Sequence, residues 1–227
     1  MAQIDPQQAI DFMTPVLRNS KAKLFVLNNF RVGEVRGARD LSAFVELIDD
    51  PGVKAKVIRH TADEGRHQYM LAKRMIELGG LGVLRPVAKE FDFLEQLSEA
   101  GRAAHPGRQV LEEKIAARTP IENRDLVGFA VGAHRIEKDA LEFLHIVWQS
   151  CGVDLGTRRV IEEIAADEEY HVRYLSDLIR QFQDEGLDEE IRAQRTMVDR
   201  INEEIGATMD ARMAEQFARL MAESAES

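Results

Sequence analysis

Two stretches of the chain, Asp63-Glu64-Gly65-Arg66-His67 and Asp167-Glu168-Glu169-Tyr170-His171, share one pattern: an aspartate, then a glutamate, then a histidine three residues after the glutamate. In an α-helix, residues three apart lie on the same face, about one turn apart. Apolar residues recur at helical intervals before and after both stretches, so a helix would bury this face. The sequence therefore predicts two helices that carry acidic and imidazole groups into an apolar interior.

A further glutamate precedes each stretch by roughly the length of a helical hairpin. Glu34 lies 30 residues before Glu64, and Glu137 lies 31 residues before Glu168. If the turn of each hairpin is midway, the two glutamates of a pair reach the same height along the helices. The second set follows the first by 103 to 104 residues. This repeat indicates two similar hairpins and a site with approximate two-fold symmetry.

Turn and capping residues divide the chain into long helical segments with little sign of strands. We expect long helices over about 21–48, 51–78, 119–150, 157–184 and 188–222, the third opening on a capping box at Thr119-Pro120-Ile121-Glu122. The predicted fold is all-α. A four-helix bundle spans 21–186, a long crossover over 80–120 joins its second and third helices, and an additional C-terminal helix occupies 187–227. Residues 1–20 are expected to form a short helical arm interrupted by Pro15, and the crossover to hold short helical pieces such as 88–100.

Composition excludes several classes of function. The chain has 227 residues and a formal charge of −10, which disfavours nucleic acid as a partner. No apolar run approaches the roughly 20 residues of a membrane span, and the first residues lack the features of a signal peptide. We therefore expect no membrane span and a cytoplasmic location. The single cysteine, Cys151, excludes a cysteine-based zinc site and an iron–sulfur cluster.

The acidic groups on the predicted buried faces require a counter-charge. An unpaired buried carboxylate costs several kcal/mol, and a pair of divalent cations would offset that cost. Four carboxylates and two neutral imidazoles suit iron or manganese. A third Glu-x-x-His pair, Glu142 and His145, lies off this face, because Glu142 is turned about 140° from Glu137 around the helix.

The pattern resembles the ferritin-like di-iron carboxylate superfamily over residues 21–186. Glu34 followed by Asp63-Glu64-Gly65-Arg66-His67 is similar to a half-site of bacterial multicomponent monooxygenases and quinone-biosynthesis hydroxylases, whereas the second half, with Tyr170 before His171, is a looser match. The resemblance implies two iron ions, with manganese or a mixed pair as alternatives. The implied ligands are Glu34, Glu64, His67, Glu137, Glu168 and His171, with Glu64 and Glu168 as candidate bridges.

Other residues near the candidate ligands have weaker assignments. The resemblance implies that Asp63 and Asp167 accept hydrogen bonds from the imidazole nitrogens that do not bind metal. His60 and His134 could donate hydrogen bonds or relay protons beside the site, or could be structural histidines. Tyr170 could carry a radical or a hydrogen bond, or could serve packing alone. Gly33 and Gly65 adjoin ligands and either clear space beside the site or allow close helix contact.

We expect an enzyme that activates O₂, an oxygenase or oxidase acting on an organic substrate with an external electron donor protein. The alternative is peroxide or iron handling, as a ferroxidase, a rubrerythrin-like peroxidase or a manganese catalase. Rubrerythrins carry an additional glutamate where this chain has Ala140, which weakens the peroxidase alternative. A metal-free acidic scaffold is the remaining class. The last helix could either pack on the bundle or form a homodimer contact.

Overall fold

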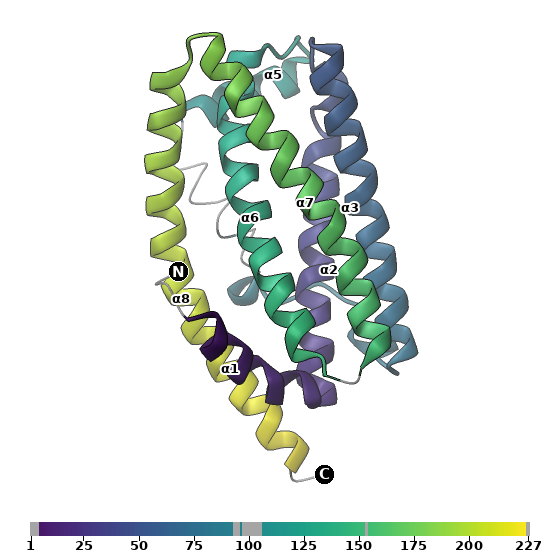
Figure 1. Cartoon of the computed structure of the whole chain (residues 1–227). Helices are drawn as coiled ribbons and strands as arrows, with labels where there is room; N and C mark the ends of the chain where they lie inside the picture. Colours follow the sequence, from purple (N-terminus) through teal and green to yellow (C-terminus); the bar gives the residue numbers. More distant parts are fainter. Residues whose placement is uncertain (1–4, 93–95, 97–105, 153, 226–227) are drawn as a thin grey trace.

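The structure is a computed structural model that describes residues 5–92, 96, 106–152 and 154–225. Four long helices, α2 (Ser20–Ser42), α3 (Pro51–Glu77), α6 (Val127–Ser150) and α7 (Leu155–Asp184), lie side by side (Figure 1). The described residues contain no strand, only an isolated bridge between Ile48 and Ile121. The prediction of an all-α chain is confirmed.

The first helix of the first hairpin, α2, ends earlier than the sequence predicts. Helix α2 stops at Ser42, and Phe44 leaves the helical conformation with φ −128° and ψ −12°, before a short 3₁₀ turn, η1 (Val45–Leu47). The prediction that this helix continues to Ile48 is wrong, because the backbone there pairs with a distant segment. Ile121 donates to the carbonyl of Leu47 at 2.8 Å, and its own carbonyl accepts from Asp49 at 3.1 Å. Helix α3 then starts as expected at Asp50-Pro51, with the Asp50 carboxylate capping the first turn.

The same pairing shifts the start of the third long helix. Thr119 and Pro120 lie outside it, because Ile121 is fully buried in the bridge to Ile48. The capping box is formed instead by Glu122 and Asp125, at the start of η4 (Asn123–Leu126), which leads into α6. The predicted box at Thr119-Pro120-Ile121-Glu122 is therefore corrected by three residues.

The N-terminal segment forms helix α1 (Pro6–Arg18), which continues through Pro15. The predicted interruption is wrong, because Pro15 lies in the last turn. The residue whose carbonyl loses its donor, Asp11, is exposed and can bond to water. Met13, Val16 and Leu17 on the other face are buried in the core, and α1 packs against α6.

The long connection between α3 and α6 is held against α2 by side-chain hydrogen bonds. It holds η2 (Leu81–Val83), η3 (Lys89–Phe91) and α5 (Pro106–Ala117). The Arg36 guanidinium donates to the Asp92 carboxylate at 2.9 Å, and the Asn28 amide donates to the carbonyl of Arg85 at 3.0 Å. Of the helical piece expected over 88–100, the structure describes η3 and a helical residue at Gln96, whereas 93–95 and 97–100 lie outside the described residues.

The last helix, α8 (Asp188–Ala225), runs beside α6 (Figure 1). It packs chiefly against α6 and also touches α2 and η3. It buries Ile191, Ile201, Met209 and Phe217. None of the described helices is long and apolar enough to cross a membrane.

The apolar core has two parts, one toward each end of the four long helices. One part includes Leu41, Val57, Val131 and Leu178. The other includes Leu27, Leu71, Leu144 and Ile164. On every one of the four helices, the segment between these two parts carries buried or nearly buried acidic or imidazole side chains. The helices therefore place a polar layer at mid-height, closed above and below by hydrocarbon.

Candidate metal centre

The polar layer contains two overlapping groups of side chains whose oxygen and nitrogen atoms converge. Each group offers four atoms that all lie within 4.8 Å of one another, and each could hold a metal ion. The first group is Glu34, Glu64, His67 and Glu168, and the second is His60, Glu64, Glu137 and His171. Glu64 belongs to both groups, so it lies between the two positions. All six residues predicted as ligands lie in this layer.

His67 turns one edge of its ring toward the carboxylates and the other edge away from them. Its Nδ1 lies 3.2 Å from both Glu34 Oε2 and Glu168 Oε1. Its Nε2 lies 3.1 Å from Asp167 Oδ2, on helix α7. Asp167 is thus placed to accept from Nε2 and to leave Nδ1 facing the carboxylates.

His171 on α7 has a matching arrangement, with its aspartate partner on α3. Its Nδ1 lies 2.7 Å from Glu168 Oε2, and its Nε2 lies 3.4 Å from Asp63 Oδ2, on helix α3. Each aspartate of the two Asp-Glu-x-x-His stretches therefore faces the histidine of the other stretch. Spacing along a single helix could not reveal this exchange of partners.

Arg66 joins the two aspartates at the edge of the layer, a role that the sequence did not suggest. Its Nη2 lies 3.3 Å from Asp63 Oδ1 and also contacts Asp167 Oδ2. Burial raises the pKa of Asp167, but hydrogen bonds from His67 and Arg66 outweigh it and leave the pKa below its ordinary value. Asp167 therefore stays ionised and holds the proton of His67 on the outer nitrogen.

Burial and mutual repulsion raise the pKa values of three of the four carboxylates of the layer, whereas the histidine partners of the fourth, Glu168, lower its pKa. Burial raises the pKa of Glu34, and it raises the pKa values of Glu64 and Glu137 well above the ordinary value, with neighbouring glutamates adding to the shift. Burial also raises the pKa of Glu168, but hydrogen bonds from His171 and His67 outweigh it and hold the pKa well below its ordinary value. Burial lowers the pKa of His67, but bonds to Glu168 and Glu34 raise it to about 10.

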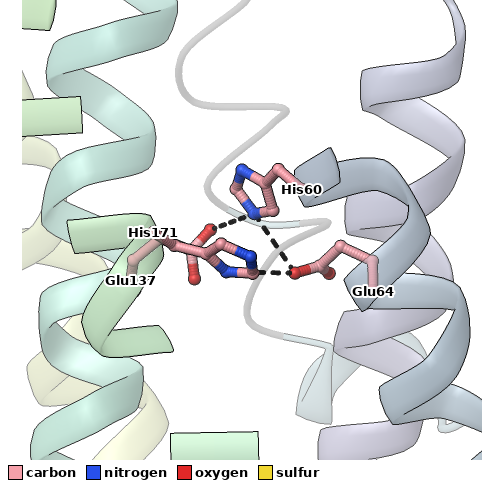
Figure 2. A group of neighbouring side chains, drawn as sticks. All are labelled: His60, Glu64, Glu137 and His171. Carbon is pink, nitrogen blue, oxygen red and sulfur yellow. Dashed lines mark ion pairs between the residues drawn. The ribbon is translucent and has the colours of Figure 1, made fainter. Parts of the chain in front are cut away.

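His60 lies inside the second group, although its sequence position suggested only a supporting role. Figure 2 shows its ring above that of His171, with Glu64 and Glu137 on either side. The two rings are stacked with centroids 3.7 Å apart. Burial and the neighbouring His171 lower the pKa of His60 to about 3, so its imidazole is neutral.

The other two supporting candidates lie outside both groups. His134 Nε2 lies 2.9 Å from the Ser176 hydroxyl. The ring of Tyr170 lies 6.1 Å from that of His171 and is covered by the Arg59 guanidinium, at 3.5 Å from the ring centroid. Glu142, in the rejected Glu-x-x-His pair, is exposed.

Gly37 on α2 is a further residue of the layer that the sequence did not indicate. A Cβ at this position would lie 2.9 Å from the Glu64 Cδ and closer still to its Oε2. A Cβ at Gly65, by contrast, would meet nothing within 4 Å. The glycine that makes room for a candidate ligand is thus on the helix opposite that ligand.

The chemistry of the layer fits a metal ion. Carboxylate oxygens and imidazole nitrogens are ligands for iron, manganese and zinc. A bound cation would offset the negative charge of ionised carboxylates in the layer. The described residues therefore define an all-helical protein with a buried histidine–glutamate cluster that could bind metal.

Comparison of the chain with protein-family models, with curated proteins and with solved structures found no match. Functional assignment therefore depends on the cluster itself.

Proposed function

We propose that the chain is a dinuclear non-haem metal protein of the ferritin-like di-iron carboxylate type, which activates O₂ to oxidise an organic substrate. Glu34, Glu64, His67, Glu137, Glu168 and His171 would hold two iron ions. The observation that carries the proposal is the convergence of four glutamates from four helices in one buried layer. The histidines alone cannot neutralise them, because the layer holds three histidines and burial beside His171 keeps one of them, His60, neutral.

The protein's own groups would prepare this centre in three ways. Asp167 and Asp63 accept from the outer nitrogens of His67 and His171, so each Nδ1 would direct a lone pair inward once a cation displaces the proton that it now shares with a glutamate. Glu64, which belongs to both groups, would bridge the two cations. The apolar clusters above and below limit access of water to the layer.

When bound, a pair of reduced iron ions supplies electrons to O₂. Repeated turnover would consume electrons from outside the chain, so we propose an electron donor protein as a partner. Peroxide or iron handling would use the same ligands. A manganese or mixed pair, a cytoplasmic location and a homodimer remain predictions from the sequence.

The proposal is tested first by metal content. We expect close to two iron ions per chain after expression with iron, and a clear loss in Glu64→Ala and in Glu168→Ala. Glu64 belongs to both groups, and Glu168 lies between His67 and His171. Glu142→Ala is the matched control, since this glutamate is exposed on α6. Both layer variants retaining the wild-type iron content would refute the assigned ligands.

The reaction itself is tested with the iron-loaded, chemically reduced protein in an oxygen electrode. A slow consumption of O₂ that an organic substrate accelerates is the expected result. Rapid release of O₂ from hydrogen peroxide would instead identify peroxide handling, and a large hollow assembly in sedimentation would identify storage.

A further inference from the structure

His60 carries a buried nitrogen without a hydrogen-bond partner. Its Nε2 lies 3.2 Å from Glu64 Oε1 and 3.2 Å from Glu137 Oε1. These distances are short, but the directions do not make hydrogen bonds, and Nε2 is left unsatisfied in a residue that is 1% exposed. A polar atom buried in this way destabilises the fold unless something else satisfies it.

The other nitrogen of the same ring is engaged. His60 Nδ1 lies 2.7 Å from the Tyr174 hydroxyl, which is itself buried on helix α7. If Nδ1 donates to this oxygen, Nε2 carries the lone pair and points into the space between Glu64 and Glu137. A histidine that binds a metal commonly donates its other ring N–H to an oxygen in this way.

We propose that His60 is a seventh protein ligand, which binds through Nε2 the cation held by Glu64, Glu137 and His171. This inference rests on the proposed dinuclear centre. Tyr174 is a positioning residue, because it fixes the ring and tautomer of His60 without touching the cation. His60 lies four residues before Glu64, so the α3 helix presents both side chains to the same position.

The resulting centre is unequal. The position defined by His60 and His171 has two imidazoles, whereas the position defined by Glu34 and His67 has one. Because imidazole nitrogen is a softer donor than carboxylate oxygen, the two cations should differ in affinity and in spectrum. This asymmetry distinguishes the seven-ligand centre from one with six ligands.

Cobalt(II) is the probe, since it reports on its ligands by absorption. Wild type is expected to bind two cobalt ions per chain, and His60→Ala to bind one of them at least tenfold more weakly, with altered absorption. His134→Ala is the matched control, because this histidine bonds to Ser176 outside both groups. His60→Ala with two ions of wild-type affinity and spectrum would overturn the inference and leave the proposed function intact. Wild type that binds no metal would overturn both.

A measurement on the wild type covers the case in which His60→Ala does not fold. In the proton NMR spectrum of the cobalt-loaded protein, ring N–H groups of metal-bound histidines shift far downfield. We expect three such exchangeable signals, from His60, His67 and His171, and two signals would contradict the inference. In Tyr174→Phe, the His60 signal alone should shift and exchange faster with solvent. An unchanged spectrum would contradict the role of Tyr174.

Discussion

The absence of a side chain at Gly37 leaves room for the carboxylate of Glu64 to cross from α3 toward α2. At this scale, the sequence predicted the acidic and imidazole groups well, because three- and four-residue spacings decide which side chains share a helix face. It missed Gly37, Arg66 and the placement of His60. Each acts through a partner on another helix or at the far side of the layer, and spacing within one helix does not encode such contacts.

The close approach at Gly37 leads to a prediction with a matched control. Gly37→Ala should weaken metal binding, because the new methyl group displaces Glu64. Gly65→Ala should leave metal binding unchanged. It should raise the free energy of unfolding by about 1 kcal/mol, because alanine has a higher helix propensity than glycine and this position is exposed. Metal titration and chemical denaturation measure the two effects. Equal metal affinity in both variants would show that Gly37 does not limit the position of Glu64.

The charge of His67 makes the stability of the metal-free protein depend on pH. Its pKa is raised from an ordinary 6.5 to about 10 in the folded state, so its contribution is complete below pH 6.5 and is lost as pH rises toward 10. Glu64 and Glu137 act in the same direction, because their raised pKa values favour the protonated, folded form. The melting temperature of the metal-free protein should therefore fall between pH 6.5 and 9, and less steeply in His67→Gln.

Metal binding should show the opposite dependence on pH. The ligands must lose their protons before they bind a cation, so affinity should rise as pH increases. A metal-free protein whose melting temperature rises over pH 6.5 to 9 would contradict the charged state assigned to His67.

At the scale of helices, reciprocal aspartate–histidine contacts join α3 and α7 and orient the two histidines. Asp63 faces His171, and Asp167 faces His67, with Arg66 between the two carboxylates.

The lengths of the hairpins could be predicted, because Glu34 and Glu64 must meet at one height. The ends of α2 and α6 could not, because the pairing of Ile48 with Ile121 joins segments more than 70 residues apart and overrides local helical propensity. Pro15 was misread because a proline in a last turn costs few hydrogen bonds.

Asp167→Asn tests the link between these helices. Loss of the negative charge should weaken the hold on the Nε2 proton of His67 and reduce metal affinity about 10- to 100-fold. Asp177→Asn is the control, since Asp177 is an exposed aspartate on the same helix. Isothermal titration with manganese measures both. An Asp167→Asn protein with wild-type affinity would remove Asp167 from any role in orienting His67.

At the scale of the molecule, one polar layer divides the core into two apolar clusters. An all-helical chain with this division follows from the sequence, because four of its long helices, α2, α3, α6 and α7, interrupt their apolar stripes with acidic or imidazole residues at a matching height. A fold selected for stability alone gains nothing from such an interruption, since buried carboxylates cost free energy unless a cation offsets their charge. The layer is therefore the feature that links the architecture to the proposed chemistry.

The most direct test is an anomalous difference map from crystals of the iron-loaded protein, recorded at the iron absorption edge. We predict two peaks about 3.5–4 Å apart, between α2, α3, α6 and α7, with Glu64 between them and His60 beside the peak shared by Glu137 and His171. A map without peaks in this layer, or with the four glutamates turned outward into water, would contradict the dinuclear centre.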